Sequence, residues 1–221
     1  MHIGIRGTGT VGHTLGMKLL ELGHNVTMGA RAEGNAKANA FVDAAAQEKL
    51  NGTARAGTFY TAGAVGDLVI NCTSGEGSVA AVKAADAKNL AGKILIDVAN
   101  PLDFSKGFPP SLTVMNTDSL GEQLQRLVPD TRVVKALNTL TAELMVNPAA
   151  LGGGDHDLLM CGNDVAAKAQ VRALLETFGW RTIVDVGDIT AARGTEAWLL
   201  LWTRLYGALK TPRFNLKLVQ K

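Results

Sequence analysis

Short apolar runs alternate with amphipathic stretches along most of the chain, which predicts strands that alternate with helices. The runs predicted as strands are 2–6, 25–29, 56–60, 67–72, 93–98, 132–137, 158–161 and 181–186. Helical spacing marks the stretch after the first strand up to residue 23, and then 35–50, 78–90, 119–127, 165–178 and 191–209. Unbroken apolar runs are typical of parallel strands that helices cover on both faces. We therefore predict an α/β fold: a doubly wound, mostly parallel Rossmann sheet with a short C-terminal helical extension.

The last predicted helix has an unusually wide apolar surface. Its apolar side chains cover one side and extend onto the others: Trp198, Leu199, Leu200, Leu201, Trp202, Leu205, Tyr206 and Leu209. Such a helix must be buried against the sheet or against a second subunit. We expect residues 1–187 to form the dinucleotide-binding domain, and residues 188–221 to complete an acceptor pocket or a homodimer interface.

Composition narrows the class of protein. A chain of 221 residues with 47% hydrophobic content can bury a substantial core, and its net charge of +2 is far from that of a nucleic-acid binder. Cys72 and Cys161 lack metal-ligand spacing and are expected to be buried thiols, while the four histidines are expected on the surface or in loops, with no metal site. No secretory signal opens the chain, and segment 191–209 carries Arg193 and Glu196, so we expect a cytoplasmic protein without a membrane partner.

A glycine-rich turn follows the first strand, opens the first helix and fits the pattern GxGxxG. In such turns the first glycine makes the turn, the second lets a pyrophosphate approach, and the third allows close packing of helix on strand. Free N–H groups and the positive end of the helix dipole attract phosphates. The turn predicts a dinucleotide site formed by Gly7, Thr8, Gly9, Thr10, Val11 and Gly12. The hydroxyls of Thr8 and Thr10 either donate to the phosphates or cap the helix.

The end of the second strand predicts which dinucleotide binds. An NAD enzyme places a carboxylate there for the ribose hydroxyls, but residues 25–31 contain none and end in Arg31. An arginine at this place can bind a 2′-phosphate in bidentate fashion and stack on adenine. Arg31 therefore favours NADP(H) over NAD(H), unless it is simply a solvated charge.

Polar residues follow three further predicted strands. Ligands of doubly wound sheets lie beyond the carboxyl ends of the strands. We expect these strand ends to hold the nicotinamide half of the cofactor through Cys72, Thr73, Ser74, Ala99, Asn100, Pro101, Ala136 and Asn138. Alternatively, Asn100 and Asn138 are ordinary turn formers. Strand alternation places Lys135 on the face opposite Asn138, so we do not expect it to be catalytic.

No side chain is singled out as a proton carrier, and we predict no catalytic residue. This favours hydride transfer to an acceptor whose own ring takes the charge, where positioning supplies most of the catalysis.

With these residues, the chain resembles the family of NADP oxidoreductases that depend on the deazaflavin coenzyme F420. The resemblance rests on the glycine turn, 29–31, 99–102, 119–125, 132–139, 160–164, 184–187 and Glu196. It implies that hydride passes directly between stacked nicotinamide and deazaflavin rings, without a catalytic side chain.

The acceptor and its position remain open at this point. Alternatives are an NADPH-dependent reductase of a flavin, a quinone or an imine, and a non-catalytic NADP(H)-binding redox sensor. We expect the acceptor to lie between Asn100, Asn138 and loop 152–156, with His156 either touching it or exposed. The basic tail either steers an acidic acceptor or is merely solvated, and its residues are Lys210, Arg213, Lys217 and Lys221.

Overall fold

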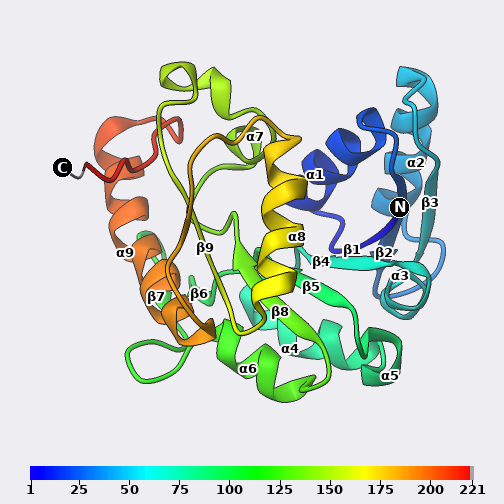
Figure 1. Ribbon diagram of the computed structural model, residues 1–221, viewed down its shortest axis with the longest axis horizontal. Coiled ribbons are helices and arrows are strands. Elements are labelled where there is room, and N and C mark those ends of the chain that lie inside the picture. The colour runs from blue at the N-terminus through cyan, green and yellow to red at the C-terminus, as the bar shows by residue number, and fades with distance from the viewer. Residues whose placement is uncertain (220–221) are drawn as a thin grey trace.

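Figure 1 shows the computed structural model, in which helices cover both faces of an eight-stranded sheet. The structure describes residues 1–219, so Lys221 of the basic tail lies outside the described residues. The strands of the sheet are β1 (His2–Arg6), β2 (Asn25–Ala30), β3 (Ala54–Thr58), β4 (Leu68–Asn71), β5 (Ile94–Asp97), β8 (Arg132–Ala136), β9 (Leu158–Gly162) and β10 (Ile183–Asp185).

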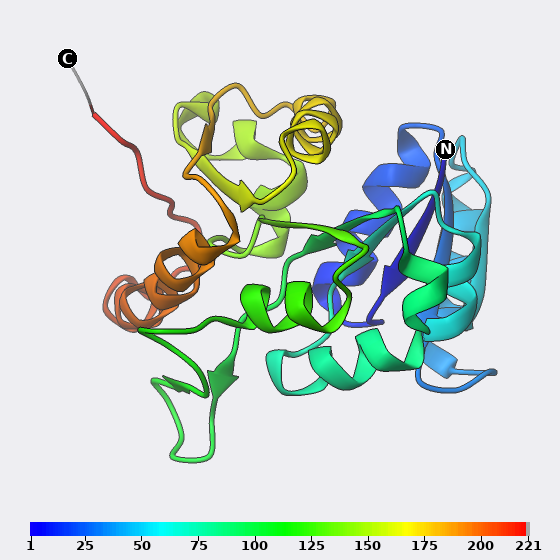
Figure 2. The same cartoon turned by 60° about the horizontal axis from the view of Figure 1, so that its bottom comes forward.

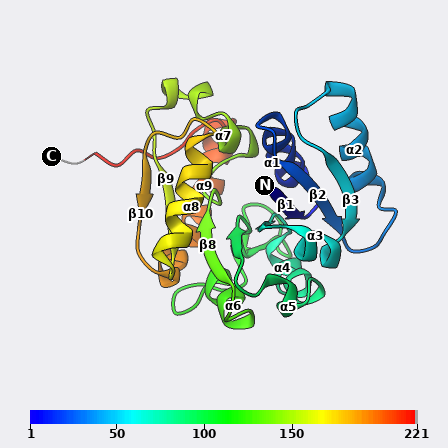
Figure 3. The same ribbon diagram turned by 45° about the vertical axis from the view of Figure 1, so that its right-hand side comes forward.

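The sheet order is β10-β9-β8-β5-β4-β1-β2-β3, with β10 and β3 at opposite edges (Figure 3). All neighbouring strands pair in parallel except β8 and β9, which are antiparallel. The prediction of a doubly wound, mostly parallel Rossmann sheet is thereby confirmed.

Two helical layers enclose the sheet. One contains α1 (Thr10–Glu21), α2 (Ala36–Glu48), α7 (Ala142–Val146) and α8 (Val165–Glu176). The other contains α3 (Phe59–Val65), α4 (Gly75–Ala84), α5 (Ala87–Leu90), α6 (Leu120–Leu127) and α9 (Ala192–Leu209). Three 3₁₀ turns, Pro148–Ala150, Gly152–Gly154 and Ile189–Ala191, complete the helical segments. No helix within the described residues is long and apolar enough to cross a membrane.

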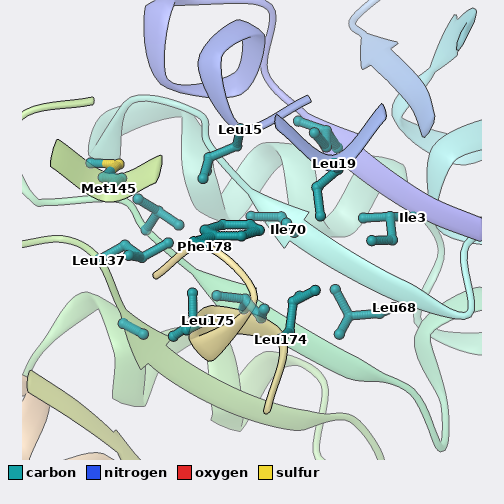
Figure 4. Close-up of a cluster of buried hydrophobic side chains, with 14 of the residues drawn as sticks. Ile3, Leu15, Leu19, Leu68, Ile70, Leu137, Met145, Leu174, Leu175 and Phe178 are labelled. Carbon is teal, nitrogen blue, oxygen red and sulfur yellow. The ribbon is translucent and has the colours of Figure 1, made fainter. Parts of the chain in front are cut away.

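Apolar side chains fill the space between the sheet and each layer. Figure 4 shows part of the first core, where side chains of α1 and α8 meet those of β1 and β4. Leu15, Leu19, Ile3 and Ile70 in this cluster are at most 2% exposed. This core fixes α1 against β1 and thereby the glycine turn that joins them.

Strand register places four polar residues side by side at the carboxyl ends of neighbouring strands. Arg6 pairs with Asn71, Asn71 with Asp97, and Asp97 with Lys135. All four side chains are completely buried. The strands β1, β4, β5 and β8 therefore end side by side, and their carboxyl ends lie next to the glycine turn.

The local structure departs from the predictions in three places. Tyr60 lies in α3 rather than in a strand, because the Thr58 hydroxyl accepts from the N–H of Thr61 and begins a helix. The helix predicted over 78–90 starts at Gly75 and is interrupted at Asp86, whose φ of 63° is not helical. Segment 102–112 forms a hairpin of β6 (Leu102–Asp103) and β7 (Ser111–Leu112), which projects from the body in Figure 2.

The face of α9 that packs on the rest of the chain is not its wide apolar face, so of the two predicted ways of burying that apolar face only the second subunit stays a prediction. The helix buries Ala192, Thr195, Glu196, Leu199 and Thr203, most of which are small or polar. Its wide apolar face instead remains partly open, with Leu201 and Leu209 just over 50% exposed. Glu196 lies on this buried face, where its carboxylate accepts hydrogen bonds from the N–H groups of Leu120 and Gly121.

Candidate functional site

The glycine turn has the geometry that a pyrophosphate requires. Gly7 has a φ of +115°, and a side chain on Gly12 would place its Cβ 2.0 Å from the carbonyl oxygen of Gly7. No atom of the described residues lies within 4 Å of the corresponding position on Gly9, so its backbone is open to a ligand. Gly9 is the N-cap of α1 and no side chain caps the helix, which excludes that role for Thr8 and Thr10. The first N–H groups of α1 are therefore available to phosphate oxygens.

A cavity of about 500 Å³ lies between the glycine turn and the end of β2. Arg31, Asn35 and Lys37 line it, together with Gly7, Thr8 and Gly9. No carboxylate in residues 1–219 forms an ion pair with Arg31 or Lys37. Two cations without an ion-pair partner, in a cavity beside the glycine turn, are suited to a phosphate group. Lys37 was missed in the sequence, although its place in the first turn of a helix predicted to start at residue 35 was a usable signal.

The main cavity has a volume of about 820 Å³ and runs from the glycine turn to the hairpin. Gly9, Thr10 and Val11 line one end, and Leu102 to Ser105 line the other. Between them lie the predicted residues Cys72, Thr73, Ser74, Ala99 and Asn100. Because Cys72, Thr73 and Ser74 also line the smaller cavity, the two form neighbouring parts of one site.

Hydrogen bonds fix the floor of this site at the end of β4. The Asn71 amide donates to Asp97 Oδ1 at 2.8 Å and to Ser78 Oγ at 3.1 Å. The Thr73 hydroxyl donates to Asn71 Oδ1 at 2.8 Å. Thr73 therefore presents a fixed backbone and side chain to the cavity, since its partners are buried and bonded in turn.

Asn138 and Ala136 do not reach either cavity, contrary to the prediction. Ala136 is completely buried, and the Asn138 amide donates to Asn100 Oδ1 at 2.9 Å and to the Thr195 carbonyl at 3.0 Å. The Asn100 amide donates back to the Asn138 carbonyl at 2.7 Å. Asn138 thus lies behind Asn100 and supports it. Pro101 is likewise buried and is not among the lining residues.

A buried ionic cluster lies beneath the same loop. Lys135 is completely buried, and its Nζ lies 2.7 Å from Asp97 Oδ2 and 2.8 Å from Glu196 Oε1, and donates to the Ala99 carbonyl. Burial alone would lower the pKa of Lys135, but the two carboxylates outweigh it and raise the pKa above its usual value.

The cluster also ties α9 to the rest of the fold. Glu196 accepts from the N–H groups of Leu120 and Gly121, at the start of α6. Lys135 and Asn138 do not face opposite ways, contrary to the prediction, because Leu137 has a φ of 65° and breaks the strand alternation. Both side chains approach α9, and Lys135 is not among the lining residues of the main cavity.

His156 and its loop lie elsewhere. His156 is 5% exposed, with Nε2 at 2.9 Å from the Pro148 carbonyl and Nδ1 at 2.9 Å from the Asn215 amide. Its ring also packs edge-on against Trp180. The alternative that His156 is exposed was wrong. His156 and loop 152–156 are not among the lining residues of the main cavity, so this cavity gives no support to a contact between His156 and the acceptor.

Two further expectations need correction. We singled out no proton carrier in the sequence, although Tyr206 and Lys210 have the Tyr-x-x-x-Lys spacing of the proton-transfer pair in short-chain dehydrogenases. Tyr206 stacks on Trp202, and neither Tyr206 nor Lys210 lines the main cavity, so the match does not build an active site there.

Cys161 is buried as predicted, whereas Cys72 is only partly buried and lines the site.

A Rossmann sheet, an open glycine turn and two adjoining cavities along the strand ends define a dinucleotide-binding protein. The family model described as NADP oxidoreductase, coenzyme F420-dependent, matches residues 2–101. A crystal structure of a candidate F420-dependent NADP reductase from Arthrobacter sp. FB24 is 48% identical, covers 99% of both chains and has a TM-score of 0.91. The chain therefore belongs to the family of coenzyme F420-dependent NADP oxidoreductases, which confirms the resemblance stated from its residues.

Curated relatives match over shorter segments. The F420-dependent NADP reductase of Methanocaldococcus jannaschii is 29% identical over 136 residues, which are 60% of this chain and 58% of that protein. The rat metalloreductase STEAP3 is 35% identical over 112 residues, which are 50% of this chain and 21% of that protein. A reductive aminase from Aspergillus terreus, 22% identical over 95% of this chain and 62% of its own, shares the fold with a TM-score of 0.65.

Proposed function

We propose that the protein binds NADP(H) along the glycine turn and transfers a hydride between the nicotinamide and a ring acceptor in the main cavity. The observation that carries this proposal is that the two cavities adjoin and share the lining residues Gly9, Cys72, Thr73 and Ser74. The smaller one offers two uncompensated cations for a 2′-phosphate, and the larger one continues past the strand ends to the hairpin.

The residues fit this cofactor. The approach of Gly12 to Gly7 excludes a side chain where helix and turn must pack, and the exposed backbone of Gly9 leaves room for the pyrophosphate. Thr73, Ser74 and Asn100 would hold the nicotinamide half, since they line the cavity. When bound, NADPH would supply the hydride, and the protein would supply position and a cleft whose lining includes the apolar residues Val11, Val98, Leu102 and Phe104.

Coenzyme F420 is the acceptor that family membership suggests, and flavins, quinones and imines are the alternatives. Anaerobic oxidation of NADPH with this panel tests the hydride transfer. Turnover with any ring acceptor supports an oxidoreductase, whereas tight NADPH binding without turnover of the panel would favour a non-catalytic redox sensor.

The cofactor assignment is tested by calorimetric titration with NADPH and NADH. Losing a charged hydrogen bond to the 2′-phosphate costs about 2 kcal/mol, or about thirtyfold in affinity. We therefore expect Arg31→Ala to reduce the preference for NADPH by about thirtyfold, with NADH affinity unchanged. Arg55→Ala is the matched control, because Arg55 is exposed and outside both cavities. Equal loss in both variants, or an unchanged preference in Arg31→Ala, would contradict the assignment.

A further inference from the structure

The Thr73 hydroxyl lies where the two cavities adjoin. Thr73 lines both cavities, and a Cβ built on Gly7 would lie 2.9 Å from the backbone nitrogen of Thr73, so this residue is directly beside the glycine turn. Its side chain belongs to a set of hydrogen bonds with Asn71, Ser78 and Asp97. This set fixes where the hydroxyl hydrogen points, and the direction decides which ligand groups the hydroxyl can bind.

The carboxylate of Asp97 fixes the orientation of the first amide in this set. Asp97 and Lys135 are completely buried, and Asp97 Oδ2 lies 2.7 Å from Lys135 Nζ. An ion-paired carboxylate only accepts hydrogen bonds, so the Asn71 atom at 2.8 Å from Asp97 Oδ1 is the amide nitrogen. The amide oxygen of Asn71 therefore points the other way, toward Thr73.

The hydrogens of the three neighbouring side chains can then be assigned. The N–H groups of the Asn71 amide donate to Asp97 and to Ser78 Oγ, and the Ser78 hydroxyl donates to the Ser74 carbonyl at 3.0 Å. The amide oxygen of Asn71 can only accept, so Thr73 donates to it at 2.8 Å. Sharing this hydrogen with Ser78 Oγ, at 2.9 Å, also keeps it inside the protein. The Thr73 hydroxyl therefore has lone pairs, but no hydrogen, left for a ligand.

On the proposed function, we infer that Thr73 accepts a hydrogen bond from a hydroxyl of the ribose in the nicotinamide half of NADP(H). Phosphate oxygens offer only lone pairs, so Thr73 disfavours the pyrophosphate, which the N–H groups of α1 bind instead. The ribose hydroxyls are the donors of the cofactor nearest to its pyrophosphate, whereas the amino groups of adenine and carboxamide lie at its two ends. The adenosine ribose carries the 2′-phosphate and belongs with Arg31, which leaves the other ribose for Thr73.

Asn71 and Asp97 are positioning residues in this inference. Both are completely buried, and neither is among the lining residues of the two cavities. Without the Asn71 oxygen, the Thr73 hydrogen is free to turn toward the cavity. The hydroxyl then no longer presents its lone pairs in one fixed direction, and the ribose loses a preorganised acceptor.

Calorimetric titration of Thr73→Val with NADPH tests the contact, because valine keeps the shape and removes the hydroxyl. We expect Kd for NADPH to rise about fivefold, which corresponds to about 1 kcal/mol, and Thr73→Ser to stay within about twofold of wild type. The probe 2′,5′-ADP carries the 2′-phosphate but lacks the nicotinamide ribose, so Thr73→Val should bind it within about twofold of wild type. Thr14→Val, in α1 and outside both cavities, is the matched control and should change neither Kd.

Asn71→Leu tests the positioning role. We expect it to raise Kd for NADPH about threefold in the wild-type background and to add less than about 1.5-fold to Thr73→Val, because the direction of an absent hydroxyl has no effect. A merely structural role of Asn71 would instead give the same factor in both backgrounds. Circular dichroism and 2′,5′-ADP titration show whether Asn71→Leu is folded, and the two Thr73 variants test the contact independently of it.

The outcomes separate this inference from the proposed function. An unchanged Kd for NADPH in Thr73→Val, or an equal loss for 2′,5′-ADP, would overturn the inference and leave the proposed NADP(H) site. The acetylpyridine analogue of NADP⁺ has no carboxamide N–H, so an effect of Thr73→Val on NADP⁺ that is absent with this analogue would also overturn it. A wild type that binds no NADPH would overturn both.

Discussion

Replacing Lys135 by Met tests the role of the buried ionic cluster. The substitution keeps most of the aliphatic volume but removes the cation from between Asp97 and Glu196, both completely or almost completely buried. Breaking a buried ion pair by removing one partner costs about 3–5 kcal/mol, because the remaining charge stays buried. For a chain of this length that corresponds to a decrease in Tm of about 10 °C.

The loss of unfolding free energy in Lys135→Met should depend on pH. In the wild type the raised pKa of Lys135 means that its stabilising contribution is complete at neutral pH and is lost only as the pH rises through the raised value. In Lys135→Met two carboxylates stay buried without the cation between them. The free-energy cost of burying these charges falls only when the carboxylates take up protons. We therefore expect the difference in unfolding free energy from wild type to be larger at pH 8 than at pH 5.

Urea unfolding followed by tryptophan fluorescence at both pH values measures these quantities. Lys18→Met is the control, because Lys18 pairs with Glu21 on the surface and such pairs contribute at most about 1 kcal/mol. A loss below about 1 kcal/mol in Lys135→Met, or a loss that grows on acidification, would refute the reasoning.

Two further predictions concern the turn and the outer face of α9. Gly12→Ala should weaken NADPH binding at least about tenfold in titration, because its Cβ would meet the Gly7 carbonyl, whereas Gly194→Ala has open space and should bind normally. We propose that the open apolar face of α9 is the interface of a homodimer. Light scattering should then give a dimeric wild type and a monomeric Leu201→Glu variant. A monomeric wild type would reject this interface.

The sequence allowed the sheet, the glycine turn and five strand-end residues that line the main cavity to be predicted, because each depends on local patterns. Apolar runs mark strands, and a turn between strand and helix fixes its own geometry. The missed features depend on partners far along the chain. Glu196 binds α6 from 75 residues away, and His156 is buried by Asn215, 59 residues later. At Leu137 a single positive φ reversed the expected direction of Asn138, and strand periodicity contains no sign of such a change.

The carboxylate of Glu196 makes the Rossmann unit dependent on a helix that follows it in the chain. A fragment ending at residue 187 would leave Lys135 with one counter-ion and the first N–H groups of α6 without their acceptor. The C-terminal helix is therefore not an appendage that can be exchanged freely. Any replacement has to return a carboxylate to this point, whereas the outward-facing positions of α9 are free to change with the surroundings of the protein.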